Sequence, residues 1–259
     1  MIVPLWLLSI ILGVVEGLTE FLPISSTGHL ILVSHWFGFT GDRAEVFEIF
    51  IQIGAVIAVI VEYRNKLIDV IRTGSFKFFA NLAIAFLPAA VLGLAVHHWI
   101  SEHLFGPRTV AAALIVGAIA IIVIERMRKT SQVGSVDDVG PVRAGLIGLA
   151  QCISLWPGFS RSAATILGGM LCGLERKTAT EFSFFLAIPT LGAATVYDLY
   201  KKHDLLVPGD MTWLLLATVV SFLVAWASIR WLIRFVATHD LTPFAWYRIV
   251  LGIVVLLMA

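Results

Sequence analysis

The chain has 259 residues, of which 59% are hydrophobic and only 14% charged. With a mean hydropathy of +0.95, this composition argues against a soluble domain and favours a membrane protein. The net charge is +1, so no basic tail points to nucleic acid, and no nucleic acid is expected as a partner.

The first predicted element is an interrupted helix. Residues 2–15 are apolar, a polar turn follows, and a second apolar arm runs near residues 28–39. The turn region contains Glu16, Glu20, Pro23, Ser25, Ser26, Thr27 and Gly28. Neither arm is long enough to cross a bilayer, which takes about 17–25 residues per helix. Broken helices persist at membrane depth only under a cover of protein or a water-filled cavity, so we predict a re-entrant helical hairpin.

Three apolar stretches suited to spanning follow, near residues 46–62, 78–97 and 109–124. After a polar linker at residues 126–143, the same order of elements returns. The second half contains a broken region at 144–156 and 163–174, then stretches near 181–198, 212–234 and 244–258. We therefore predict an all-α polytopic membrane protein, one membrane domain over residues 1–259, with six transmembrane helices and two re-entrant helical hairpins.

The two halves, about 1–125 and 144–259, are predicted to be an inverted repeat. Gly13 and Gly148 differ by 135 residues, and an offset of 134 at the turns pairs Ser26 with Ser160. A hairpin enters and leaves on one side, whereas three spans make an odd number of crossings. The second half therefore starts on the opposite side of the membrane from the first.

Basic residues predict the orientation of the chain. Twelve of them fall on one side: Arg64, Lys66, Arg72, Lys77, Arg126, Arg128, Lys129, Arg143, Arg176, Lys177, Arg230 and Arg234. Four fall on the other: Arg43, Arg108, Lys201 and Lys202. The richer side should be cytoplasmic, which places both termini and the mouth of the first hairpin outside. Arg161 and Arg248 fall in or near the membrane, and Tyr247 is interpreted as an interfacial anchor.

Ionisable and hydroxyl side chains gather in the first hairpin. Glu16 and Glu20 are spaced i, i+4 and share a helix face. Such a pair suits a divalent cation, or one base with one supporting acid, and the simpler interpretation is a protonated pair that closes helix contacts. His29 follows Ser26 by three residues, a spacing that would bring an imidazole to the hydroxyl as a base or as an acid towards a phosphate oxygen. A packed structural histidine is the simpler alternative.

Each hairpin turn opens a helix whose N-terminus points into the bilayer. Ser25, Ser26 and Thr27 stand at one start, and Ser160 and Ser162 stand at the other. Helix capping alone would explain these hydroxyls. Two such N-termini meeting near an arginine would instead form a phosphate site, because free N–H groups, the helix dipole and a guanidinium fork all favour an anion. The arginine between them is Arg161.

Two segments resemble a known family. The stretch from Gly13 to His29, GVVEGLTEFLPISSTGH, resembles the first signature of the undecaprenyl-diphosphate phosphatases, the bacterial bacitracin-resistance proteins. The stretch from Pro157 to Thr165, PGFSRSAAT, resembles their second signature, and the similarity runs the whole length, including Glu181–Phe184. The resemblance implies hydrolysis of a polyprenyl diphosphate to the monophosphate and inorganic phosphate. It also implies a bacterial plasma-membrane protein that recycles the lipid carrier of peptidoglycan synthesis.

The resemblance also implies roles for residues. Glu16 and Glu20 would bind Mg²⁺ or Ca²⁺, Ser26 would be the nucleophile, and Arg161 would clamp the diphosphate. Glu20 or His29 would act as acid or base. Five further hydroxyl residues of the two motifs would contact substrate: Ser25, Thr27, Ser160, Ser162 and Thr165. Direct attack by water is the alternative to a covalent phosphoserine, and a homodimer is left open.

Two other functions fit parts of the pattern. Inverted repeats with broken helices are typical of secondary transporters, in which Glu16 and Glu20 would bind a proton or sodium ion and the substrate would be an anion or lipid phosphate. Flipping of the lipid product belongs to the same alternative. A phosphatidic-acid type of lipid phosphatase is disfavoured, because no histidine follows Arg161 within the second motif.

Overall fold

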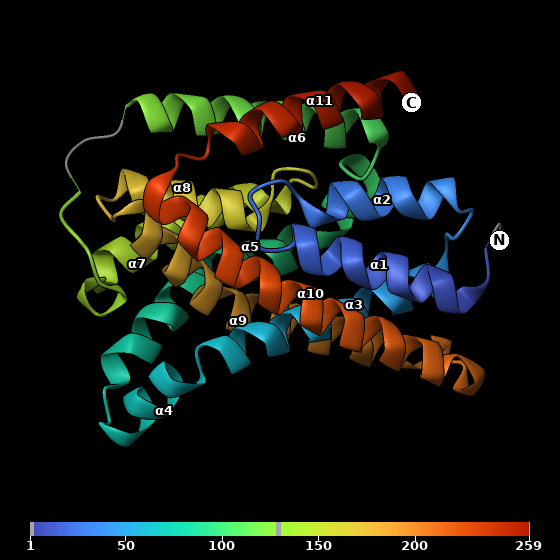
Figure 1. Ribbon diagram of the computed structural model, residues 1–259, viewed down its shortest axis with the longest axis horizontal. Coiled ribbons are helices and arrows are strands. Elements are labelled where there is room, and N and C mark those ends of the chain that lie inside the picture. The colour runs from blue at the N-terminus through green and yellow to red at the C-terminus, as the bar shows by residue number, and fades with distance from the viewer. Residues whose placement is uncertain (1–2, 128–130, 259) are drawn as a thin grey trace.

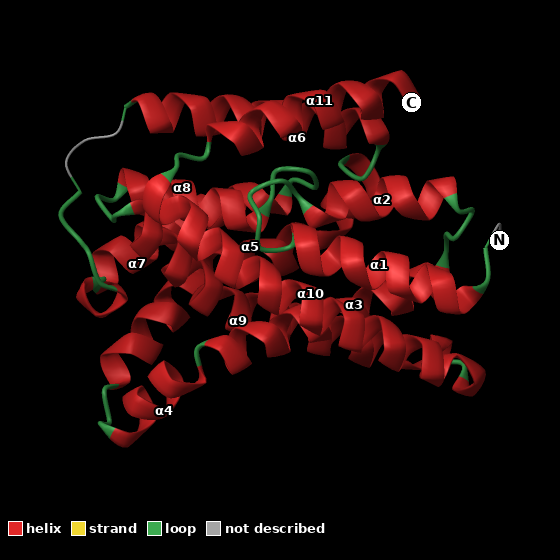
Figure 2. Ribbon diagram, viewed as in Figure 1, coloured by secondary structure: helices red, strands yellow, loops and turns green. Residues whose placement is uncertain are grey.

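The protein is described here from a computed structural model covering residues 3–127 and 131–258. These residues form helices and no β-strand (Figure 2). The helices of the first half are α1 (Leu5–Thr19), α2 (Ser26–Trp36), α3 (Asp42–Glu62), α4 (Arg64–Arg72), α5 (Phe76–His103) and α6 (Pro107–Arg126). Those of the second half are α7 (Pro141–Gln151), α8 (Arg161–Leu171), α9 (Arg176–Lys201), α10 (Met211–Thr238) and α11 (Thr242–Met258). Short 3₁₀ turns lie at Val136–Asp138, Cys152–Leu155, His203–Leu205 and Pro208–Asp210.

Five helical segments in the described chain are long and apolar enough to cross a membrane. They are Asp42–Glu62, Phe76–Val96, Pro107–Arg126, Arg176–Lys201 and Pro208–Thr238. The predicted all-helical membrane class is thereby confirmed. The sixth expected span, 244–258, forms α11, whose 17 residues place it among the shorter apolar helices with α1 and α7.

Both predicted hairpins are helix–turn–helix segments, and their second arms begin earlier than expected. α2 starts at Ser26 and α8 at Arg161. The residue before each helix is a serine with positive φ, 72° at Ser25 and 78° at Ser160, and its hydroxyl accepts a bond from a backbone N–H of the first turn. Capping by these serines starts the helices within the polar turn.

The two caps correct the predicted alignment of the halves. Ser25 and Ser160 are equivalent in structure, so the offset of 135 holds through the turn and the pairing of Ser26 with Ser160 was wrong. Arg161 occupies the position of Ser26. With this offset Pro23 matches Gly158, which has a φ of 97°, and not Pro157. Matching the prolines and serines by letter shifted the two turns by one residue relative to each other.

Small residues let the helices that carry the site approach closely. A Cβ at Gly13 or Gly17 of α1 would lie 2.6 Å from a backbone oxygen of α10, and one at Gly54 of α3 would lie 2.3 Å from another. A Cβ at Gly148 of α7 would lie 2.4 Å from the Ala85 oxygen of α5. Close backbone packing through glycine is a typical source of helix association in membranes. α1 and α3 are therefore held against α10, and α7 against α5 (Figure 1).

The turns of the two hairpins lie together at the centre of the molecule (Figure 2). Their contact is direct, because the Ser162 hydroxyl at the start of α8 donates to the Leu22 carbonyl in the first turn. α1 begins and α11 ends at one end of the molecule, and α4 lies at the other, where Lys66 pairs with Asp137 (Figure 1). Arg128 and Lys129, two of the residues used to predict orientation, lie outside the described residues.

Candidate active site

A cavity of about 740 Å³ opens beside the two hairpin turns. Seven of the predicted site residues line it: Glu16, Glu20, Ser25, Ser26, Thr27, Ser160 and Arg161. The cavity continues along α3 and α9, past Glu48 and Gln52, to Glu45 and Lys202, which form an ion pair of 2.7 Å. His29, Ser162 and Thr165 are not part of its lining.

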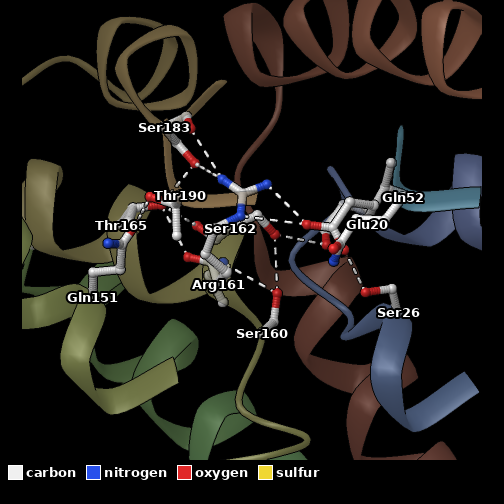
Figure 3. A network of polar contacts seen from close by, with 12 residues as sticks. Glu20, Ser26, Gln52, Gln151, Ser160, Arg161, Ser162, Thr165, Ser183 and Thr190 are labelled. Atoms are coloured by element: carbon white, nitrogen blue, oxygen red, sulfur yellow. Dashed lines mark hydrogen bonds and ion pairs between the residues drawn. The ribbon is translucent and has the colours of Figure 1, made fainter. Parts of the chain in front are cut away.

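Glu20 connects the two hairpins. One carboxylate oxygen, Oε2, accepts a hydrogen bond of 2.5 Å from the Ser26 hydroxyl. The other, Oε1, accepts bonds of 3.1 and 3.3 Å from Nη2 and Nε of Arg161 (Figure 3). Both charged side chains are more than 90% buried. A hydroxyl, a carboxylate and a guanidinium are thus aligned at the cavity wall, with the carboxylate placed to take the hydroxyl proton.

Thr165 and Ser183 hold Arg161 in place through hydrogen bonds. Arg161 Nη1 donates to the Ser183 carbonyl at 3.0 Å and to its hydroxyl at 3.4 Å. The Thr165 hydroxyl donates to the Arg161 carbonyl at 2.9 Å and lies 2.6 Å from the Ser183 hydroxyl. Both hydroxyl residues are buried, so Thr165 supports the guanidinium in this structure and does not face the cavity. Ser183 lies within the Glu181–Phe184 similarity, the one sequence signal that could have suggested it.

Ser162 joins the turns. Its hydroxyl donates to the Leu22 carbonyl at 2.8 Å and lies 2.9 Å from the Ser160 hydroxyl (Figure 3). Ser160 in turn accepts from the Ala163 N–H at 3.2 Å, as Ser25 does from Gly28 at 3.3 Å. The serine cluster therefore caps both helices and fixes one hairpin against the other.

Arg248 of α11 was missed as a site residue by sequence reasoning. Its side chain is fully buried and donates to the carbonyls of Pro23 in the first turn and Gly158 in the second, at 3.0 and 3.1 Å. It also donates to Ala113 and Leu114 of α6. The guanidinium thus holds both turns together and places a cation near them. An arginine inside an apolar stretch was its only sequence signal.

The His29 imidazole is turned away from Ser26. Its Nδ1 lies 2.7 Å from the Ser25 carbonyl oxygen, and its Nε2 lies 2.7 Å from the hydroxyl of Tyr247 on α11. The expected contact with Ser26 does not form, because the ring points one turn back along α2 and the Ser26 hydroxyl is bonded to Glu20.

The acidic residues partly suit a divalent cation. Glu16 lines the cavity and its carboxylate makes no hydrogen bond with the described residues, whereas both carboxylate oxygens of Glu20 accept hydrogen bonds. Among the described residues no group of three or more His, Cys, Asp and Glu side chains is arranged to hold a metal. Hard cations with few protein ligands complete their coordination shell with water and substrate phosphates. Two carboxylates would therefore bind such a cation only together with a phosphate anion.

The site combines buried hydroxyls, two helix N-termini, a guanidinium and carboxylates inside an apolar helical bundle, and the hydroxyls, N-termini and guanidinium are groups that favour a phosphorylated ligand. A sequence model of the bacitracin resistance protein BacA family matches residues 9–254, so the chain belongs to this family. It is 53% identical over 258 residues to an undecaprenyl-diphosphatase of Dechloromonas aromatica, covering 97% of this chain and 94% of the relative. It is 55% identical over 256 residues to undecaprenyl-diphosphatase 2 of Rhodospirillum rubrum, covering 96% and 93%.

Proposed function

We propose that this protein hydrolyses undecaprenyl diphosphate to undecaprenyl phosphate and inorganic phosphate. The main support for the proposal is the chain of hydrogen bonds from Ser26 through Glu20 to Arg161, which connects one hairpin to the other beside the cavity. Relatives that share about half of this sequence over nearly their full length are named undecaprenyl-diphosphatase. The activity would recycle the lipid carrier of peptidoglycan synthesis and oppose bacitracin.

In the proposed reaction, Arg161 and the N–H groups at the starts of α2 and α8 bind the phosphate oxygens. Glu20 accepts the hydroxyl proton while Ser26 Oγ attacks the terminal phosphorus. The bond from that phosphorus to the bridging oxygen breaks, and the lipid monophosphate leaves with the proton that Glu20 took up, so that Glu20 is ionised again. Water, activated by Glu20, then cleaves the phosphoserine and releases phosphate. In the alternative, Glu20 activates water for direct attack, and trapping of a phosphoserine at position 26 distinguishes the two.

Glu16 and Glu20 would hold Mg²⁺ or Ca²⁺ together with substrate oxygens, and the cation would neutralise phosphate charge. Carboxylate oxygens are the donors that these cations prefer, and those of Glu16 and Glu20 lie beside the proposed anion site. Because the two carboxylates provide few ligands, we expect the cation to bind much more weakly without a diphosphate. Calcium or magnesium titration with and without inorganic diphosphate measures this difference.

We further propose that the two halves are inverted relative to the membrane, with both termini and the cavity mouth outside the cytoplasm. The matching order of elements and the equivalent caps at Ser25 and Ser160 support the repeat. The side with fewer basic residues includes Lys202, which lines the cavity. Impermeant thiol labelling of intact cells tests the orientation: a cysteine at Lys202 should be labelled, and one at Lys177 should not.

The test of function is phosphate release by purified protein in detergent, supplied with a polyprenyl diphosphate and no ion gradient. Arg161→Ala should lower turnover by about 10²-fold or more, as loss of a buried donor to developing charge does. Arg108→Ala, which removes an exposed arginine at the start of α6, is the matched control and should retain activity. A chelator should reduce release. No release by the wild type, together with gradient-driven uptake of a lipid phosphate into vesicles, would favour the transporter.

A further inference from the structure

Tyr247 on the last helix is paired with His29 of the first hairpin. The two rings are stacked, with centroids 5.6 Å apart and planes within 4°, and the Tyr247 hydroxyl lies 2.7 Å from Nε2. The two residues are 218 positions apart in the chain. Tyr247 is 46% exposed, so its position does not follow from burial in the core. An interfacial anchor needs no such partner, and the pairing calls for another explanation.

The Ser25 carbonyl determines the direction of both hydrogen bonds. A carbonyl oxygen can only accept, so Nδ1 of His29 carries the hydrogen that it donates over 2.7 Å. In the neutral ring, Nε2 then carries the lone pair, and the Tyr247 hydroxyl donates to it. The chain of donors therefore runs from Tyr247 through the imidazole to the Ser25 carbonyl, and neither ring nitrogen is directed to Ser26.

That carbonyl belongs to a strained residue. Ser25 has a φ of 72°, a region that non-glycine residues adopt at a cost of about 1–3 kcal/mol and keep only when neighbours hold them there. The peptide that begins with this carbonyl leads directly to Ser26, whose hydroxyl is bonded to Glu20. A group that fixes the Ser25 carbonyl therefore also fixes where the Ser26 hydroxyl lies.

We propose that Tyr247 is a positioning residue for diphosphate hydrolysis, acting through His29. It holds the imidazole against the Ser25 carbonyl and so keeps the Ser26 hydroxyl on the Glu20 carboxylate. The proposal rests on the function inferred above and assigns His29 a supporting role in place of proton transfer to or from the reacting atoms. The proton of Ser26 goes to Glu20.

Two substitutions at His29 separate the roles. The side-chain amide of His29→Asn places an N–H donor where Nδ1 was, so it can still bond the Ser25 carbonyl, but it cannot exchange protons as an imidazole does. His29→Gln places its amide near Nε2 and loses the Nδ1 donor. A positioning role predicts that His29→Asn keeps at least tenfold more turnover than His29→Gln. An acid or base role predicts that both are equally inactive, which would overturn the proposal.

Tyr247→Phe supplies the second test. Loss of one neutral hydrogen bond should lower kcat by about three- to tenfold, with KM unchanged, because the cavity lining is intact. In the His29→Asn background the same change should have no further effect. Tyr200→Phe, which removes an exposed hydroxyl at the end of α9, is the matched control and should be silent. Equal kcat for Tyr247→Phe and Tyr200→Phe would refute the positioning role, whereas an inactive wild type would refute the proposed function itself.

Discussion

Replacing Arg248 by methionine should weaken the contact between the turns of the two hairpins. The guanidinium donates four hydrogen bonds, to the carbonyls of Ala113, Leu114, Pro23 and Gly158. The two α6 carbonyls lie inside a helix and keep their helical partners. Those of Pro23 and Gly158 lie in turns and have no other donor among the described residues, so the substitution leaves two carbonyls without a partner.

Each buried carbonyl left without a donor costs about 1–3 kcal/mol, or about 2–6 kcal/mol for the two. Removing a buried cation that has no carboxylate partner returns part of this cost. We therefore expect a net loss of about 2–4 kcal/mol. For a chain of this size, that loss lowers Tm by roughly 5–15 °C.

Thermal unfolding of the purified protein in detergent, followed by phosphate release below the lower Tm, measures both consequences. Turnover should fall because the turns carry Ser26 and Arg161. Arg248→Lys should be intermediate, since one ammonium cannot replace a planar fork of donors. Arg108→Met controls for loss of an exposed arginine. A wild-type Tm and wild-type turnover for Arg248→Met would refute the idea that this residue joins the hairpins.

Three further changes test the same architecture. Gly117→Ala places a Cβ 2.0 Å from Arg248 Nη2, so it should lower Tm by several degrees. Gly192→Ala is the control, because its Cβ meets nothing within 4 Å, and it should not lower Tm. Equal Tm values for the two variants would argue against the steric reasoning. Ser162→Ala loses the bond to the first turn and should cost about 1 kcal/mol of stability, read from thermal or denaturant unfolding. Glu20→Gln should lower kcat by about 10²–10⁴-fold, as loss of a general base does, and a kcat within a few-fold of wild type would remove Glu20 from that role.

Local sequence patterns were sufficient to predict the class of protein and the position of the candidate site in the chain. Runs of apolar residues predicted a helical membrane protein, because a bilayer requires long stretches that satisfy their own backbone hydrogen bonds. Polar turns within short apolar arms predicted two interrupted helices. Seven residues in and beside those turns line part of the cavity: Glu16, Glu20, Ser25, Ser26, Thr27, Ser160 and Arg161.

Contacts between distant segments were decided only by the tertiary structure. Spacing along α2 predicted that His29 would face Ser26, but the Ser25 carbonyl and Tyr247 compete for the ring and orient it elsewhere. Arg248 looked like one arginine in an apolar stretch, and its importance follows from four carbonyls contributed by three other segments. A sequence specifies which donors and acceptors exist and which helices carry them. Which donor meets which acceptor depends on how closely the helices pack, and glycines such as Gly17, Gly54 and Gly148 act through that packing.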